Sequence, residues 1–579
     1  MKKCLLLLVA VFSLLAFNAC KDDEVKIVGP VVPPVVPDEP EVNTPNYLIM
    51  FYAVGGGNLD SFILSNILQS CSEGTDDKVK MTFEYKLSSH LQQLYDNFKG
   101  TRRFTADDNK NLIGRYQEFS KIRYMLTGPG QEAFLNTVKS EQIGDSEYNM
   151  SSTKSLADFI KWSKQQYPDA KRTILIISGH GDAWKVSTEG AIDAGLKTRG
   201  MLMDNNFTPA SYLTLNETVE GIKQGGGVDM FYTEACLMSM YENIYAYSSV
   251  AKYLITAVET TPSLGGDYKT FLQLLKGIGN TDQEFEEAMH KYVDACTSAD
   301  WWGSGKKSYN DLAFYNLSKL NQVTPVLKKI TETLVEKYKS EESVNPTATD
   351  LPWGDRFVPY IRQAILGCEV ANSKEEINIL SYEDLLPEGF KNALETDADV
   401  VHNEYNTFLL NELIDWLRFN ETPGAKKLWE KDPEKCNALI TFLSQQCKNS
   451  YIITDMMRVL DNQLDAVGAQ NNPFKALRKE LVAAVKSMGY IKCSILDEKP
   501  GIDQAYDLCT PGVTIIPLTE EYYNDKIYSK ITEELPQVND AVKSYQTLEF
   551  DKQVGWSKFL QTIDVIPSAM TNPTRKFVH

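Results

Sequence analysis

Two residues with side chains suited to nucleophilic catalysis stand where short apolar runs stop. His180 ends the apolar run within 173–184, and Cys236 ends the one within 228–247. A thiol can attack a carbonyl carbon when a neighbouring imidazole acts as its base. The two residue types in this arrangement predict the chemistry of a cysteine peptidase.

The runs before these residues have the composition of buried parallel strands, because they are rich in β-branched and aromatic residues and stop abruptly. In an open α/β sheet, ligands bind at the carboxyl ends of the strands. Other segments alternate between strand and helix patterns, which predicts a mostly parallel sheet with helices on both faces. The further expected strands are 46–54, 79–87 and 252–259, with 121–128 as a weaker candidate, and the expected helices are 60–69, 154–167, 213–223 and the residues from Cys236 through about Tyr247.

The C-terminal part has a different pattern. Residues 270–500 are mostly of helical type, with breaks at 351–357 and 421–427. A late strand is expected at 512–518 and a closing helix at 548–560. The predicted organisation is a signal peptide (1–19), an acidic and proline-rich tether (20–45), a catalytic α/β domain (46–345) and a mostly helical C-terminal region with a late strand (346–579).

The choice of base is narrow, because the chain has five histidines and only His180 lies between glycines at a strand end. Small neighbours allow a substrate backbone to approach, and they leave the Gly181 N–H able to face a developing oxyanion. A Gly-His-Gly sequence after a strand is by itself more often a structural turn. The presence of Cys236 favours the catalytic interpretation.

Cys236 also has a simpler interpretation, since free cysteines are often buried apolar residues. Two features favour a nucleophile. The expected helix start would lower the thiol pKa through the helix dipole, and Cys236 follows His180 by 56 residues, a caspase-like order and interval. Cys296 ends an amphipathic helical segment with no strand before it, so it is not expected to be the nucleophile.

Two motifs carry a resemblance to a known family. Ser178-Gly179-His180-Gly181 after one strand, and Glu234-Ala235-Cys236-Leu237-Met238 with Glu242 after the other, resemble the clostripain family of cysteine peptidases, relatives of caspases and gingipains. The resemblance is dense over 46–320, thin over about 345–500, and returns at 510–562. It implies a caspase-like fold, with His180 as base, Cys236 as nucleophile, and the backbone N–H groups of Cys236 and Gly181 as oxyanion donors.

The resemblance also implies a substrate preference. The family cuts after Arg or Lys and pairs the substrate cation with carboxylates near the nucleophile. Glu234 stands where the family has Asp, one methylene shorter. Asp267 and Glu259 are further candidates for the cation partner, although solvated loop acids are an equally good interpretation of both.

Maturation and cofactors follow from the same resemblance. Family members often mature by cleavage between the histidine and the cysteine, where Lys197 and Arg199 would be the self-cleavage sites. Some relatives need calcium, but no EF-hand loop is present, so a calcium requirement cannot be assigned and no metal enters the expected chemistry. Gly55-Gly56-Gly57 lacks the lysine of a phosphate loop, which favours a turn.

The N-terminus resembles that of an exported lipoprotein. Lys2 and Lys3, an apolar stretch and Cys20 match a secretory signal with a lipid-acceptor cysteine, although an ordinary signal peptide with an incidental cysteine is an alternative. The acidic residues at 21–24 resemble an export tag, and the prolines in 25–45 indicate a stiff tether. These features predict an outer-membrane lipoprotein at the cell surface.

The net negative charge of the chain limits the partners that it is expected to bind. The formal charge is −19, and removal of residues 1–19 makes it −21, so nucleic acid is not an expected partner. Proteins or peptides are the expected substrates. A rival interpretation is a non-enzymatic surface lipoprotein that binds glycans or peptides, with Trp301-Trp302 as a stacking pair. A third is an inactive peptidase homologue that only binds peptides.

Overall fold

The structure is a computed structural model of the chain. It describes residues 44–56, 59–88, 99–115, 138–181, 200–208, 210–258, 261–262, 265–298, 311–342, 386–396, 422–436, 450–466, 472–493, 510–514 and 545–563, with the short pieces 361, 376–377, 408–409, 413, 416–417, 439 and 506. The candidate strand at 121–128 and the Trp301-Trp302 pair lie outside these residues.

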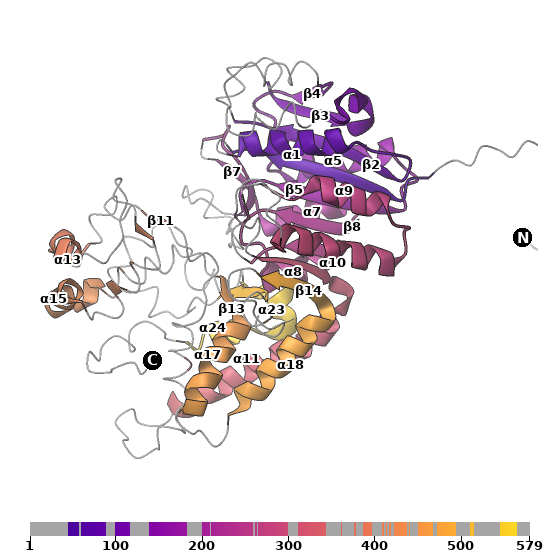
Figure 1. Cartoon of the computed structure of the whole chain (residues 1–579). Helices are drawn as coiled ribbons and strands as arrows, with labels where there is room; N and C mark the ends of the chain where they lie inside the picture. Colours follow the sequence, from indigo (N-terminus) through magenta and orange to yellow (C-terminus); the bar gives the residue numbers. More distant parts are fainter. Residues whose placement is uncertain are drawn as a thin grey trace, which may run out of the picture. The chain divides into compact units, whose positions relative to one another are not determined.

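Within the described residues, the main sheet has nine strands in the order β14-β10-β9-β8-β5-β1-β2-β3-β4 (Figure 1). Its centre is parallel, as the sequence predicts, and consists of β2 (Val79–Lys86), β1 (Tyr47–Val54), β5 (Arg172–Ser178), β8 (Val228–Glu234) and β9 (Ala251–Thr256). All eight residues of β1 are buried, because both faces of the sheet are covered.

Antiparallel strands extend the sheet on both sides. On one side are β3 (Thr101–Thr105) and β4 (Glu141–Gly144), and on the other are β10 (Asp311–Asn316) and β14 (Gly489–Cys493). The prediction of a mostly helical stretch over 270–500 misses the last two strands. The assignment of 346–579 to a separate region stays a prediction, but β14 from that region pairs with β10 of the sheet.

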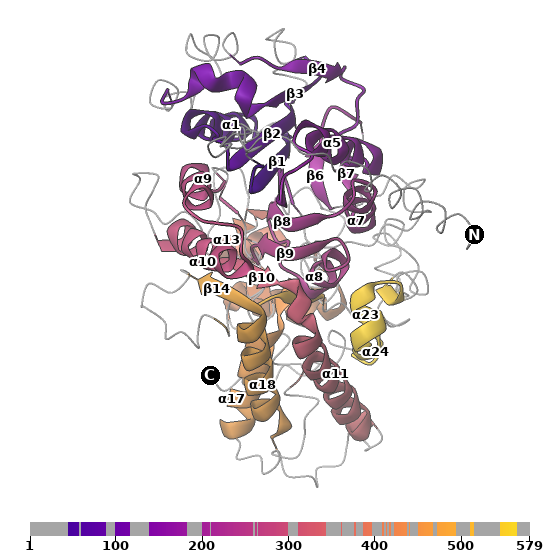
Figure 2. The ribbon, with the colours of Figure 1, turned by 90° about the vertical axis from the view of Figure 1, so that its right-hand side faces the viewer.

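Helices cover the two faces of the sheet (Figure 2). One face carries α1 (Asp60–Glu73), α9 (Tyr268–Lys276) and α10 (Asp282–Ser298), and the other carries α5 (Thr153–Gln166), α7 (Leu215–Gln224) and α8 (Tyr241–Tyr247). Alternate residues of β1 pack into the two cores: Tyr47 and Ile49 on the first side, Leu48 and Met50 on the second.

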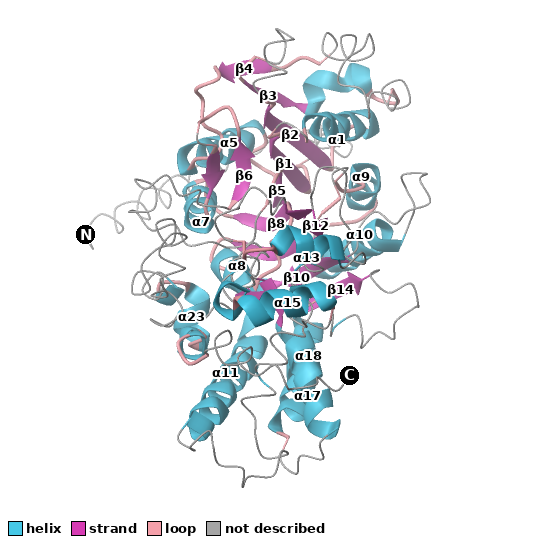
Figure 3. Cartoon of the chain, turned by 90° about the vertical axis from the view of Figure 1, so that its left-hand side faces the viewer, coloured by secondary structure: helices cyan, strands magenta, loops and turns pink. Residues whose placement is uncertain are grey.

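The C-terminal helices include α11 (Leu320–Glu342), α17 (Ile453–Ala466) and α18 (Pro473–Met488), and α18 packs against both of the others (Figure 3). The expected break at 421–427 is largely wrong, because α15 (Pro423–Lys431) begins there with proline in its first turn. The expected closing helix is divided by Gly555 (φ 75°) into α23 (Glu549–Val554) and α24 (Ser557–Leu560).

The remaining elements are short. They are the 3₁₀ helices η2 (Ala106–Leu112) and η4 (Leu317–Lys319), helix α13 (Phe390–Thr396), and the strand pairs β6 (Met201–Asp204) with β7 (Ser211–Leu213), β11 (Glu376–Ile377) with β12 (Phe408–Leu409), and β13 (Ser450–Ile452) with β15 (Gly512–Thr514). The late strand expected at 512–518 begins where β15 does. None of the described helices has the length and apolar character that a membrane crossing requires.

Candidate active site

The two residues predicted to carry the chemistry follow neighbouring strands at the same edge of the sheet. Strands β5 and β8 are parallel, and Ser178 pairs with Glu234 in their register. His180 and Cys236 each come two residues beyond that pair. The Gly179 N–H donates to Glu234 O at 3.2 Å, which keeps the two chains together past the end of β5.

Gly181 brings the backbones of the two segments into direct contact. A Cβ atom at this position would lie 2.6 Å from Cys236 O and 2.8 Å from Cys236 N. No side chain fits in that space. The sequence predicts that small residues beside His180 allow another backbone to come close, and at Gly181 the backbone of Cys236 does so.

The turn after β1 packs against the His180 ring. Gly56 has φ +58°, and a Cβ there would lie 2.8 Å from His180 Cδ2. On the backbone side, His180 O accepts a hydrogen bond of 2.8 Å from Leu202 N in β6. Two segments that are distant in the sequence thus contact this residue. The turn interpretation of Gly55-Gly56 agrees with the structure, while Gly57 lies outside the described residues.

Cys236 differs from the other cysteines that the structure describes. Of its four free cysteines, Cys71, Cys296 and Cys436 are buried and Cys236 is partly exposed. Burial raises the pKa of the Cys296 thiol to about 12, so this thiol is protonated and unreactive near neutral pH. The exclusion of Cys296 as a nucleophile is consistent with this position.

The Cys236 thiol contacts a loop of its own chain. Its Sγ lies 3.6 Å from Thr261 Oγ1 and 4.0 Å from Thr261 O, on the segment that follows β9. No sequence pattern indicates this contact, since Thr261 is an ordinary loop residue. A substrate carbonyl that approached Sγ from this side would have to displace Thr261.

The expected helix start at Cys236 is wrong. Helix α8 begins at Tyr241, five residues later, and Leu237 takes a left-handed conformation with φ 63°. This conformation is costly for leucine and interrupts any helix at that point. The helix dipole therefore does not act directly on Cys236, and the imidazole remains as the expected activating group.

Two backbone hydrogen bonds join the turn after Cys236 to the residue that follows β9 and to β15. Ser239 N donates to Ala257 O at 2.9 Å, after the end of β9. Gly512 N, in β15, donates to Ser239 O at 2.8 Å. The turn after Cys236 is thus fixed partly by the C-terminal segment.

Glu234 precedes Cys236 by two residues, and its carboxylate forms hydrogen bonds within the protein. The residue is only 4% exposed, Asn66 Nδ2 donates to its Oε2 at 3.4 Å, and Gly266 N donates to its Oε1. Burial raises its pKa, although hydrogen bonds from Ser178, Gly266, Tyr268 and Asn66 oppose that rise. The structure therefore brings Glu234 close to Cys236, but with its charge turned toward the segment 265–266.

Asp267 caps a helix. Its Oδ1 accepts from Thr270 N at 3.0 Å and its Oδ2 accepts from Thr270 Oγ1 at 2.6 Å, at the start of α9. It is half-buried and follows the glycines that contact Glu234. Glu259, Lys197, Arg199 and Cys20 lie outside the described residues.

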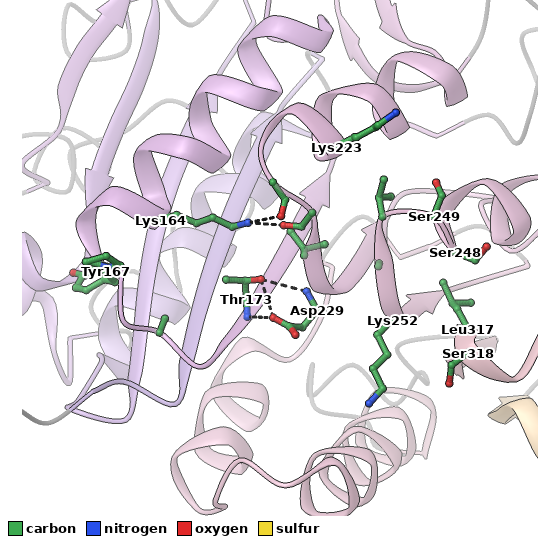
Figure 4. A pocket seen from close by; sticks show the side chains of 17 residues that line it. Lys164, Tyr167, Thr173, Lys223, Asp229, Ser248, Ser249, Lys252, Leu317 and Ser318 are labelled. Atoms are coloured by element: carbon green, nitrogen blue, oxygen red, sulfur yellow. Dashed lines mark hydrogen bonds between the residues drawn. The ribbon is translucent and has the colours of Figure 1, made fainter. Parts of the chain in front are cut away.

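A second place that could hold a ligand lies away from His180 and Cys236. It is a pocket of about 820 Å³ at the opposite edge of the sheet, where β5, β8 and β9 begin (Figure 4). Its lining contains no cysteine or histidine, and Lys164 there donates to Gly226 O and Gly227 O. Among the described residues, no group of three or more His, Cys, Asp or Glu side chains is placed to hold a metal ion.

The family of the protein follows from its sequence taken as a whole. The model of the clostripain family matches residues 105–468, which is more than half of the chain. The chain belongs to the clostripain family. The resemblance inferred from the His180 and Cys236 motifs is thereby confirmed.

Several solved structures of family members match this clostripain-family chain, whereas no curated protein does. A secreted C11 cysteine protease from Bacteroides thetaiotaomicron, bound to an irreversible peptide inhibitor, is 13% identical and covers 49% of this chain and 70% of its own, with a TM-score of 0.34. An inactive zymogen C11 protease from Parabacteroides distasonis is 12% identical and covers 88% and 98%, with a TM-score of 0.40. A B. fragilis cysteine protease is 13% identical and covers 60% and 95%, with a TM-score of 0.26.

Proposed function

We propose that this clostripain-family protein is a cysteine endopeptidase with Cys236 as nucleophile and His180 as its base. The observation that carries the proposal is the register of β5 and β8. The paired residues Ser178 and Glu234 are each followed two residues later by one member of the dyad. The contact between Gly181 and the Cys236 backbone supports the same assignment.

The proposed reaction uses a covalent intermediate. His180 accepts the thiol proton, and the Cys236 thiolate attacks the carbonyl carbon of the scissile peptide bond. The backbone N–H groups of Cys236 and Gly181 stabilise the oxyanion. His180 then gives the proton to the departing amine, and water, deprotonated by His180, hydrolyses the thioester and restores the thiol.

We further propose that the bond cut follows Arg or Lys. Glu234 lies two residues before Cys236, Asp267 directly follows Gly266, which donates to Glu234, and Glu259 is a third candidate from the sequence. Because Glu234 is only 4% exposed and Gly266 N donates to it, a cationic side chain could reach its carboxylate only after the segment with Gly266 moves. The preference therefore depends on a movement of the segment 265–267, and an enzyme that cannot make this movement would prefer neutral residues.

The location and maturation of the enzyme are also proposals. The sequence of residues 1–45 supports export, lipidation at Cys20 and display at the outer membrane. Lys197 and Arg199 are the proposed self-cleavage sites. Replacing both residues and still obtaining two chains on activation would contradict this; palmitate labelling of a Cys20→Ala variant tests the anchor.

Hydrolysis of fluorogenic peptides with Arg, Lys or a neutral residue before the cut tests the proposed activity. We expect Cys236→Ala and His180→Ala to abolish turnover, and Cys296→Ala, the matched buried cysteine, to retain it. Equal rates for the wild type and Cys236→Ala would overturn the assignment and favour a peptide-binding homologue. A preference for neutral residues would overturn the cation pocket alone.

A further inference from the structure

We infer that a buried ion pair between Lys86 and Asp204 positions His180, acting through strand β6. Neither residue is a candidate for contact with substrate. The inference rests on the proposed function, because it assigns a role in placing the proposed base. It concerns a pair of residues separated by 118 positions in the sequence.

The pair is enclosed and its hydrogen bonds are complete. Lys86 Nζ donates to Asp204 Oδ2 at 2.9 Å and to the carbonyl oxygens of Ser146 and Tyr148, each at 2.9 Å. These three acceptors match the three donors of an ammonium group. Both side chains of the ion pair are 0% exposed, and the ring of Phe207 lies 4.9 Å from Lys86 Nζ.

The other carboxylate oxygen is also held. Asp204 Oδ1 accepts from Asn206 N at 3.1 Å and from Asn206 Nδ2 at 2.8 Å. Asn206 Nδ2 in turn donates to Leu87 O at 3.2 Å. The end of β6 is therefore joined to the end of β2 by a network that fixes its position along the sheet edge.

The same short strand holds the histidine segment. Met201 forms a bridge with Gly181, and Leu202 N donates to His180 O. The next residue, Met203, lies with its carbonyl beside Gly56, which also contacts the His180 ring. Four residues thus connect the backbone of His180 at one end to the ion pair at the other.

The energetics favour a positioning role. A buried ion pair contributes little net stability compared with apolar residues of the same volume, whereas losing one partner leaves a costly unpaired charge. Such a pair strongly disfavours any register of β6 that separates its charges. Leu202, with φ 60°, is held in an unfavourable conformation in the same strand, which indicates that the surroundings determine the path of β6.

The position of β6 in the sequence gives the pair a further consequence. Gly200–Asp204 directly follows the segment with Lys197 and Arg199, where we propose self-cleavage. After such a cut, β6 would begin at a new chain end. The ion pair would then keep β6, and with it His180, attached to β2.

Asp204→Asn is the first test, because it removes the charge and keeps the shape. Glu84→Gln is the matched control: Glu84 lies on the same strand as Lys86, is also buried, and pairs with Arg103 instead of β6. Both proteins are compared with the wild type by circular dichroism, by peptide hydrolysis and by hydrogen exchange at Leu202.

We expect Asp204→Asn to lower kcat by about tenfold to a hundredfold with KM within about threefold, because a base displaced by about 1 Å affects the chemical step. We also expect the Leu202 amide of this variant to exchange at least about tenfold faster. Without the ion pair, β6 should separate from the His180 segment more often, and the exchange rate rises in proportion to this opening. Glu84→Gln should change neither quantity. A folded Asp204→Asn protein with wild-type kcat and wild-type exchange would overturn the inference.

A second variant covers the case in which Asp204→Asn does not fold. Lys86→Met with Asp204→Leu removes both charges, so no unpaired charge is left. We expect this protein to fold and to keep a low kcat, and wild-type turnover in it would overturn the inference. If the wild type itself does not hydrolyse peptides, the proposed function fails. The exchange rate of the Leu202 amide in the variants still tests whether the Lys86–Asp204 ion pair keeps β6 bound to the His180 segment.

Discussion

Adding one methyl group at Gly181 tests the proposed active-site geometry most directly. In Gly181→Ala the new Cβ would lie 2.6 Å from Cys236 O and 2.8 Å from Cys236 N. Nonbonded carbon and oxygen atoms need about 3.5 Å. The two backbones would therefore have to separate by roughly 0.9 Å, and neither belongs to a flexible side chain that could turn aside.

A separation of this size predicts a large kinetic effect. Misplacing catalytic groups by about 1 Å lowers the rate by about a hundredfold, which corresponds to about 2.7 kcal/mol of lost transition-state stabilisation. We expect this loss in kcat/KM because the methyl group moves the Gly181 N–H, the proposed oxyanion donor, away from Cys236. KM alone should change less, since the groups proposed to bind the substrate cation are elsewhere.

The assay is hydrolysis of a fluorogenic Arg peptide, with active sites titrated by iodoacetamide and folding checked by thermal denaturation. Gly277→Ala is the matched control, because that glycine ends α9 and a Cβ there would meet no atom closer than 3.3 Å. It should keep wild-type activity. A Gly181→Ala protein that is folded and within about threefold of the wild type would refute the proposed contact between the two backbones.

Three further predictions concern the surroundings of Cys236. Burial raises the pKa of Glu234, so the protonated carboxyl group contributes stability that is complete below its unfolded pKa of about 4.3 and is lost as pH rises through the folded pKa. Urea titrations from pH 4.5 to 7.5 should therefore show the wild type losing free energy of unfolding relative to Glu234→Gln. A difference between the two proteins that stays constant with pH would contradict this. Asp267→Asn keeps a good helix cap and removes the charge, so its melting temperature should hardly change while the preference for Arg over a neutral residue falls by about tenfold if Asp267 binds the cation; an unchanged preference excludes that role. A chain ending at 345 lacks β14 and β15, so we expect it to be cleaved rapidly by trypsin and to be inactive, and a stable, active fragment would show that the sheet does not need them.

Much of the central sheet, and the position of His180 and Cys236 at one edge of it, could be predicted from the sequence. The strands before His180 and Cys236 are apolar on both faces, and this pattern is typical of buried parallel strands in a chain with helices between them. The carboxyl-edge rule then places both residues at one rim without any knowledge of the register. The family match confirms the resemblance that the two motifs indicated.

The elements that the sequence did not predict depend on contacts between distant segments. Strand β14 has five residues directly after a 16-residue helix, and its state is decided by pairing with β10, from Asp311 against Cys493 to Tyr315 against Gly489. A helix is expected directly after Cys236 because Leu237 and Met238 are good helix formers by propensity. The helix does not begin there because Leu237 is held at positive φ. Lys86 gives no signal of its own, since a lysine at a strand end is usually solvated.

Glu234 stands where the resemblance to the clostripain family implies Asp, and the longer side chain has a structural consequence for the proposed specificity. The family's shorter acid would not extend as far from β8, whereas the Glu234 carboxylate reaches Gly266 N and lies under Gly265, where a Cβ would be 2.4 Å from Oε1. A substrate cation would compete for the carboxylate with Gly266 and Asn66, and because burial raises the pKa of Glu234, pairing would also require this buried carboxyl group to be ionised. Recognition of Arg or Lys would therefore be coupled to movement of the segment 265–267, and Thr261, which contacts the thiol, lies on the same connection between β9 and α9. Under the proposed function, a single displacement of Thr261 and the segment 265–267 would expose both Cys236 and Glu234, so these residues, rather than the acid alone, would decide which peptides are cut.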